Sequence, residues 1–171
     1  CESISSTPQA VVTSLAEMFH GHADFLNLPL YIPNDYVRET LCNDANNSVI
    51  LKKGIFCDKV IASIGTMGKI RESDYWRGSM PPEIYKDLVE KGACGSILGR
   101  FFDANGQELA CDWNEKSISL SIQQLRNISD VVIVASPVSK APALLAALKG
   151  DFINTLITDG TTATRILNEA K

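Results

Sequence analysis

The sequence predicts an α/β fold in which a mostly parallel, Rossmann-like sheet is flanked by helices. Two short apolar runs rich in β-branched residues, at 58–65 and 130–136, are bounded by charge, glycine or serine, a pattern typical of strands buried on both faces. In the second half of the chain, strand-like runs alternate with helix-like ones. This alternation predicts right-handed βαβ units and therefore parallel strands.

The first half begins with a helix whose two ends are both marked in the sequence. Thr7 can cap it, Pro8 suits its first position, and Gly21 suits the left-handed residue that ends it after Phe19. The elements expected next are a strand at 25–32, helices at 34–42 and 47–56, and a strand at 58–65.

The second half is expected to hold a β-hairpin within the alternating pattern. A loop at 65–80 precedes a helix that starts at Pro81-Pro82 and stops at Gly92, and the hairpin at 94–111 turns at Asp103-Ala-Asn-Gly106. The elements that follow are a strand at 117–122, a helix at 123–126, a strand at 130–136, a helix at 139–149, a strand at 153–158 and a helix at 161–170.

Length and composition indicate one globular domain over residues 1–171, in the cytoplasm. The net charge is −4 and the 16 Lys and Arg are scattered, which argues against a nucleic-acid surface within this chain. Five widely separated cysteines without a CxxC pair indicate free thiols in a reducing compartment. No apolar run approaches the length of a membrane span, and no signal peptide is visible.

The start of the chain suggests a piece of a longer polypeptide. It opens at Cys1 without an initiator Met, on a short polar stretch that is typical of the loop after a strand.

Three strand ends lead into polar loops that contain glycine or serine, and these loops are the candidate binding site. They are Gly65-Thr66-Met67-Gly68, Ser136 to Lys140, and Thr158 to Thr162. Ligands of open parallel sheets bind beyond the carboxyl ends of the strands. A helix that begins near Ser139 would direct free N–H groups and a partial positive charge outward, and Lys140 would add a full charge, so this loop could hold a phosphate. Ser139 could equally be a helix cap and Lys140 a solvated side chain.

The other candidate residues support binding more than catalysis. Asp159 could accept hydrogen bonds from sugar hydroxyls, or it could simply cap the last helix. The loop from Gly65 to Gly68 is not a dinucleotide fingerprint. His20 and His22 lack further metal ligands nearby, and no nucleophile, P-loop or zinc-protease motif is present, so we expect no metal, no cofactor and no catalytic residue.

An ordered set of motifs resembles the sugar-binding domain of SorC-type transcription regulators. The set is Lys91-Gly-Ala-Cys-Gly-Ser-Ile-Leu-Gly-Arg-Phe-Phe-Asp-Ala-Asn-Gly106, Ile118 to Arg126, Val131-Val-Ile-Val-Ala-Ser136, Lys140, and Leu156-Ile-Thr-Asp-Gly-Thr-Thr-Ala163. The resemblance extends over nearly the whole chain, and the order of the motifs makes it specific.

The resemblance implies an effector-binding domain that binds a phosphorylated sugar or polyol and catalyses nothing. Its fold would resemble that of the sugar-phosphate isomerases, glucosamine-phosphate deaminases and CoA-transferases. The full protein would bind operator DNA through a helix-turn-helix domain outside this chain, and would form dimers or tetramers. The effector-binding residues implied by the loops and the resemblance together are Gly65, Thr66, Ser96, Arg100, Ser139, Lys140 and Asp159.

Two departures from the family pattern affect the expected site. Ser96 stands where the family usually has Asp, which changes a polar contact to the effector. The family's first strand and its phosphate-binding loop would precede Cys1, as would the helix-turn-helix, so the pocket would be incomplete at one side.

Two other functions stay open on the sequence alone. A sugar-phosphate isomerase or deaminase of the same fold would need a general base, for which Asp112 or Asp159 could be nominated. A purely structural oligomerisation module would bind no sugar at all.

Overall fold

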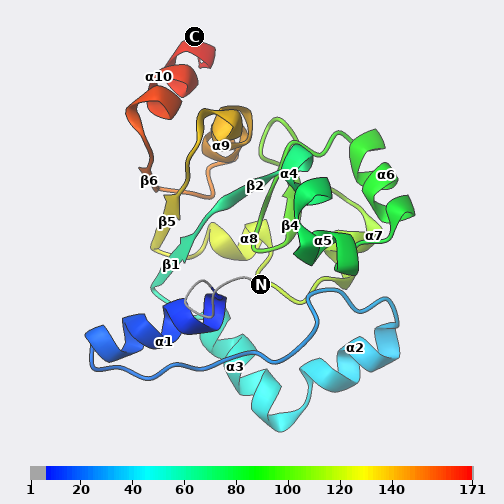
Figure 1. Ribbon diagram of the computed structural model, residues 1–171. Coiled ribbons are helices and arrows are strands. Elements are labelled where there is room, and N and C mark those ends of the chain that lie inside the picture. The colour runs from blue at the N-terminus through cyan, green and yellow to red at the C-terminus, as the bar shows by residue number, and fades with distance from the viewer. Residues whose placement is uncertain (1–6, 171) are drawn as a thin grey trace.

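The computed structural model describes residues 7–170, without the side chains of residues 71, 74, 75 and 77, and it contains two small sheets. The parallel sheet has the order β1-β5-β6, from β1 (Lys59–Ala62), β5 (Asp130–Val134) and β6 (Thr155–Ile157). The antiparallel sheet has the order β2-β3-β4, from β2 (Ile64–Thr66), β3 (Gly95–Ile97) and β4 (Arg100–Phe102). The predicted α/β class with a parallel sheet and flanking helices is confirmed (Figure 1).

Helices flank the two sheets, and several of them are capped as the sequence indicates. Thr7 caps the first helix, Asn34 the second and Asp159 the last, each by accepting a backbone N–H. The helices are α1 (Pro8–Met18), α2 (Asp35–Cys42), α3 (Ala45–Ile55), α4 (Met67–Glu72), α5 (Asp74–Ser79), α6 (Pro82–Glu90), α7 (Asp112–Lys116), α8 (Ile122–Leu125), the 3₁₀ helix η2 (Val138–Lys140), α9 (Ala141–Lys149) and α10 (Gly160–Glu169).

The chain crosses from one sheet to the other at Ser63. A single strand was expected over 58–65, but the structure divides it into β1, which pairs with β5, and β2, which pairs with β3. Since one residue separates the two strands, Ser63 lies where the sheets meet.

The larger core covers one face of the parallel sheet and continues under α9. Val131 and Ile133 of β5 are buried there, together with Leu144 of α9. On the opposite face, Ile61, Val134 and Ile157 are each about half exposed or more. The described residues therefore cover this sheet on one side only.

A second core lies among α4 to α7 and the antiparallel sheet. It centres on Trp113, which is 1% exposed, and Tyr31 stacks on it at 4.6 Å between ring centroids. Tyr31 also donates its hydroxyl to Asp112 at 2.7 Å, so the segment between α1 and α2 is held against this core.

Two strand predictions were wrong, at 25–32 and 117–122. Each segment is irregular, and they meet in one isolated bridge, Tyr31 with Ser117. Backbone bonds join the same segments at Ile32 N–H to Lys116 O and Ile118 N–H to Leu30 O. Apolar side chains that suggested strands, such as Leu30 and Leu120, pack against the two cores from segments that pair at this one bridge.

The loop, hairpin and helix-end predictions also need correction. The segment 65–80 is not a loop, because it contains β2, α4 and α5. The predicted turn at 103–106 is present, and the chain returns from it beside β4 through the isolated bridge of Phe102 with Glu108. The segment before it is not a single strand, because β3 and β4 already form a hairpin that turns at Leu98-Gly99, whose φ angles are 49° and 82°. At the end of α1 the left-handed residue is His20, with φ 53°, in place of the expected Gly21.

Candidate functional site

An open cavity of about 260 Å³ lies at the carboxyl ends of the parallel strands, where ligands of such sheets bind. It is lined by Ser63, Val134, Ala135, Ser136, Lys140, Ile157, Thr158 and Asp159. The loops 136–140 and 158–162 therefore meet at the same edge of the sheet, as the parallel topology predicts. We refer to this hollow as the carboxyl-end cavity.

Lys140 provides the positive charge of the carboxyl-end cavity. Its Nζ donates to Ser63 Oγ at 3.1 Å, and no carboxylate among residues 7–170 forms an ion pair with it. Burial lowers the pKa of Lys140 from its ordinary value. A half-buried ammonium without a counter-ion gains from an anionic ligand, which replaces part of its lost hydration.

The helix start beside Lys140 differs from the predicted phosphate seat. The 3₁₀ turn η2 precedes α9, so the N–H of Lys140 bonds to Pro137 O and the N–H of Ala141 bonds to Val138 O. Pro142 has no N–H at all. Residues 140–142 therefore offer no free N–H to an anion, and donors must come from residues before Lys140 or from side chains. Ser139 is exposed, and α9 has no side-chain cap.

Asp159 acts as the N-cap of α10, which was the alternative left open by the sequence. Its carboxylate accepts from Thr162 N–H at 2.9 Å, Thr162 Oγ1 at 2.6 Å and Ser136 Oγ at 2.8 Å. These bonds lower the pKa of Asp159 to about 2, the two from Thr162 being the largest causes. The carboxylate ties the two loops together, and it keeps acceptor capacity that sugar hydroxyls could use.

Gly65, Thr66 and Ser96 lie outside the residues that line the carboxyl-end cavity. Gly65 pairs with Ser96 across β2 and β3, and a side chain at Gly65 would come within 2.5 Å of Ser96 Oγ. Gly95 approaches Ala143 of α9, so its neighbour Ser96 points to the other face of the sheet. Thr66 ends β2 and precedes α4, which it does not cap with its side chain.

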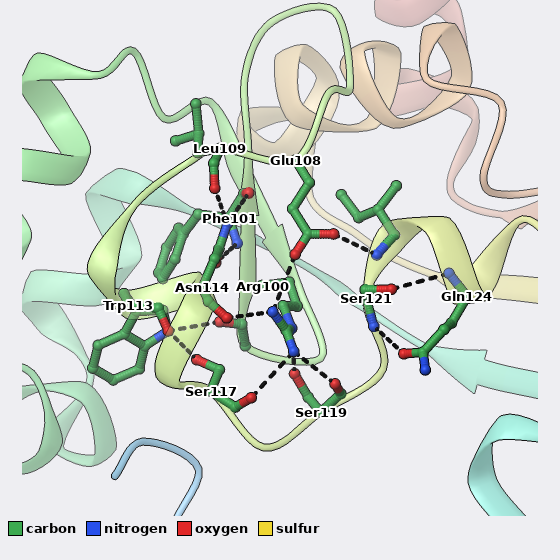
Figure 2. A network of polar contacts seen from close by, with 12 residues as sticks. Arg100, Phe101, Glu108, Leu109, Trp113, Asn114, Ser117, Ser119, Ser121 and Gln124 are labelled. Atoms are coloured by element: carbon green, nitrogen blue, oxygen red, sulfur yellow. Dashed lines mark hydrogen bonds and ion pairs between the residues drawn. The ribbon is translucent and has the colours of Figure 1, made fainter. Parts of the chain in front are cut away.

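Arg100 is engaged by the protein, in place of the ligand contact that we expected. Figure 2 shows its guanidinium surrounded by acceptors from the segment 108–119. Nε donates to Ser119 Oγ, Nη1 to Glu108 and to Asn114 O, and Nη2 to Ser117 O and Ser119 O. A guanidinium has five N–H donors, and all five are used here, so Arg100 has none left for an effector.

The sequence does not single out Ser63 and Ser136 as lining residues. It predicts that Ser63 lies within a strand and that Ser136 begins a loop. A small polar residue inside the apolar run 60–64 was the signal that could have marked Ser63, because such a residue interrupts an otherwise buried strand.

The described part of the chain offers neither a metal site nor a membrane span. No three His, Cys, Asp or Glu side chains gather there in a way that could hold a metal ion. Among the same residues, no helix combines the length and apolarity needed to cross a membrane.

Residues 2–168 match a family model described as "Putative sugar-binding domain". The chain is also similar to the deoxyribonucleoside regulator of Bacillus subtilis (strain 168), with 30% identity over 154 residues, which cover 90% of this chain and 49% of that protein. The chain thus spans about half the length of this curated relative.

Solved structures of regulators have the same fold. A DeoR family transcriptional regulator from Listeria monocytogenes aligns with a TM-score of 0.84 and 26% identity, over 92% of this chain and 64% of that one. The full-length sorbitol operon regulator SorC from Klebsiella pneumoniae aligns with a TM-score of 0.84 and 23% identity, over 93% of this chain and 51% of that one.

Proposed function

Because this chain belongs to the family of sugar-binding domains that its residues 2–168 match, and this family is found in transcription regulators, we propose that it senses a phosphorylated sugar or polyol in the carboxyl-end cavity. The resemblance to SorC-type regulators noted in the sequence is confirmed at the level of the family. The phosphate, the identity of the effector and the residues that bind it are part of the proposal.

The observation that supports an anionic effector is the unpaired cation. Lys140 reaches the cavity without a carboxylate partner among the described residues, and the cavity's own acid, Asp159, is already held by three donors. The phosphate would bind at Lys140 and Ser139, and the sugar hydroxyls at Asp159. Thr66 would act from the neighbouring strand end. Gly65 and Ser96 would act indirectly by shaping β2, and Arg100 by holding the segment 108–119.

In the longer protein, the effector would change DNA affinity through the assembly of subunits. We propose that this happens in the cytoplasm, in a homodimer or homotetramer that binds operator DNA through a separate domain. A ligand that favours one conformation about 100-fold supplies about 2.7 kcal/mol to such a shift.

An enzymatic role has less support from the site. Asp159 has a pKa of about 2, and hydrogen bonds from Lys116 and Tyr31 lower the pKa of Asp112. General bases work best with a pKa close to the working pH, which neither carboxylate has. A coupled isomerase and deaminase assay checks this point, and turnover above background would contradict a binding-only role.

Thermal unfolding of the 171-residue chain with a panel of ligands tests the proposed function. The panel contains deoxyribose 5-phosphate, ribose 5-phosphate, glucose 6-phosphate and sorbitol 6-phosphate, the unphosphorylated parents, and inorganic phosphate. At 100 times its dissociation constant, a phosphorylated ligand should add about 2.7 kcal/mol and raise the Tm by roughly 5–10 °C.

The variant Lys140→Met should abolish this stabilisation while leaving the unliganded fold intact, because Lys140 makes only one side-chain bond, to Ser63. A panel in which no phosphorylated sugar stabilises the chain more than inorganic phosphate does would contradict the proposal. A full response in Lys140→Met would show that the phosphate binds elsewhere.

A further inference from the structure

Ser63 lies at the junction of the parallel and antiparallel sheets. It separates β1 from β2, at the point where the chain leaves β5 and begins to pair with β3. Its side chain is exposed, and it lines the carboxyl-end cavity opposite the loops that follow β5 and β6.

The hydroxyl of Ser63 meets the ammonium of Lys140 from this position. The Nζ to Oγ distance is 3.1 Å, and the ammonium is necessarily the donor. A serine hydroxyl that accepts a hydrogen bond still has its own proton to donate. No other described residue takes that proton, so it can point into the cavity.

The backbone from Lys140 to Pro142 offers no free N–H beside the ammonium. The N–H groups of Lys140 and Ala141 are used within η2, and Pro142 has none. A phosphate at Lys140 presents several acceptor oxygens, which one ammonium cannot satisfy in a half-buried site. The nearest hydroxyl already bonded to the cation is that of Ser63.

We infer that Ser63 and Lys140 form one anion-binding pair, in which Ser63 fixes the ammonium and donates its own hydroxyl proton to the same phosphate. This inference deepens the proposed function and rests on it for the identity of the ligand as a phosphorylated compound. Ser63 is thereby a binding residue that the sequence did not indicate.

The electrostatics of the free chain agree with this arrangement. Burial lowers the pKa of Lys140, and a hydrogen bond accepted by a neutral hydroxyl favours the charged lysine. The elements that pack against η2 are α9, α10 and β2, and β2 has no charged residue. The charged side chains on α9, on α10 and at the α10 cap are Lys149, Arg165, Glu169 and Asp159. None of them contributes to the shift of Lys140, for which burial is the only cause.

The test compares the wild-type chain with Ser63→Ala and Ser63→Thr. Each chain carries ¹³C-labelled lysine, and NMR follows the Cε signal of Lys140, assigned with Lys140→Met, first against pH and then against inorganic phosphate at fixed pH. Ser129→Ala is the control, because Ser129 is an exposed serine at the opposite end of β5.

In Ser63→Ala, the pKa of Lys140 should fall below the wild-type value, and phosphate affinity should drop about threefold to tenfold, as expected for one hydrogen bond. Ser63→Thr keeps a hydroxyl and should restore both, and Ser129→Ala should change neither. An unchanged pKa and affinity in Ser63→Ala would overturn the inference.

The same experiment separates this inference from the proposed function. If inorganic phosphate binds through the pair but no phosphorylated sugar binds more tightly, the Ser63–Lys140 site stands and the sugar-sensing function fails. If a phosphorylated sugar stabilises the chain equally in wild type and in Ser63→Ala, the function stands and the role of Ser63 fails.

Discussion

Arg100 and Asn114 connect β4 to the segment 108–119 through side-chain hydrogen bonds. Asn114 is 2% exposed, and it accepts from the N–H of Phe101 and donates to the carbonyls of Phe101 and Leu109. Arg100 binds the carbonyls around the turn that follows α7, and Glu108 extends the network to the N–H of Ile122 at 2.7 Å (Figure 2). Together they fix the segment 108–119 against β4 through side chains, in addition to the single bridge between Phe102 and Glu108.

The variant Arg100→Lys should lower the free energy of unfolding by about 2–4 kcal/mol, because a lysine cannot reach all of these acceptors and would leave buried carbonyls unpaired. Urea denaturation measures the change. Arg165→Lys is the matched control, since its ion pair with Glu169 is largely exposed and should be worth less than about 1 kcal/mol. Equal effects in the two variants would show that the network around Arg100 contributes little.

Asp159 should make the free energy of unfolding depend on pH in the acid range. Its pKa is about 2 in the folded chain against an ordinary value of 3.8, so the carboxylate stabilises the fold above about pH 4. This contribution is lost as the pH falls through about 2, because the protonated acid accepts the Thr162 and Ser136 bonds less well.

Asp159→Asn keeps a capping oxygen but has no charge to titrate. The stability difference between wild type and this variant, from urea midpoints between pH 6 and pH 2, should therefore shrink as the pH falls. A difference that stays constant over this range would show that Asp159 is not ionised differently in the folded and unfolded chains.

At the scale of elements, the turn at 103–106 packs closely against the end of α9. Gly106 has a φ of 71°, and a Cβ there would lie 2.3 Å from the carbonyl oxygen of Ala146. The turn that the sequence predicted as the tip of a hairpin is thus also a packing contact, and its glycine is required by both conformation and space.

Gly106→Ala should destabilise the chain by about 2–4 kcal/mol, which combines left-handed strain with backbone overlap. Gly54→Ala should stabilise it by about 0.4–1 kcal/mol, because Gly54 lies within α3 and has nothing within 4 Å of the new methyl group. Thermal and urea unfolding of the two variants check the opposite signs, and a neutral Gly106→Ala would contradict the close approach of the turn to α9.

The elements that the sequence predicted well are those specified by local chemistry. Caps at Thr7 and Asn34 need only a hydroxyl or amide and the next few residues. The β-branched apolar run 131–134 favours a strand whatever it packs against. The strands expected at 25–32 and 117–122 failed because their apolar residues serve packing contacts far along the chain, which local periodicity does not record.

The candidate site was predictable in outline, and its details depended on tertiary contacts. Parallel topology alone brings the loops after β5 and β6 to one edge, which placed Lys140 and Asp159 correctly in the same cavity. The 3₁₀ turn that uses the donors before α9, the network that occupies Arg100 and the break in the strand at Ser63 all involve contacts between distant segments. A sequence motif specifies residue types, and it does not specify contacts between distant segments.

For the molecule as a whole, burial is distributed unequally along the chain. Of the described residues, none in α1, α2 or α3 is buried, and large apolar side chains such as Phe19 and Phe56 are about four-fifths exposed. By contrast, α9 buries five residues beneath β5 and the antiparallel sheet. Figure 1 shows the three N-terminal helices lying to one side of the body that contains both sheets. The segment between α1 and α2 is attached to this body through Tyr31 and the bridge to Ser117.

Amide hydrogen exchange should therefore divide the isolated chain into two levels of protection. Amides of α1 to α3 should exchange through local opening, with low protection, because little buried surface is lost when these helices open. Amides of β5 and α9 should exchange only through global unfolding. Tyr31→Ala should lower protection at 30–32 and 116–118 further and leave β5 unchanged, because it removes the Trp113 stacking and the Asp112 bond from the attachment. Equal protection in α1 and α9 would mean that the N-terminal helices unfold together with the core, and that a covering surface, such as a second copy of the chain, stabilises them in solution.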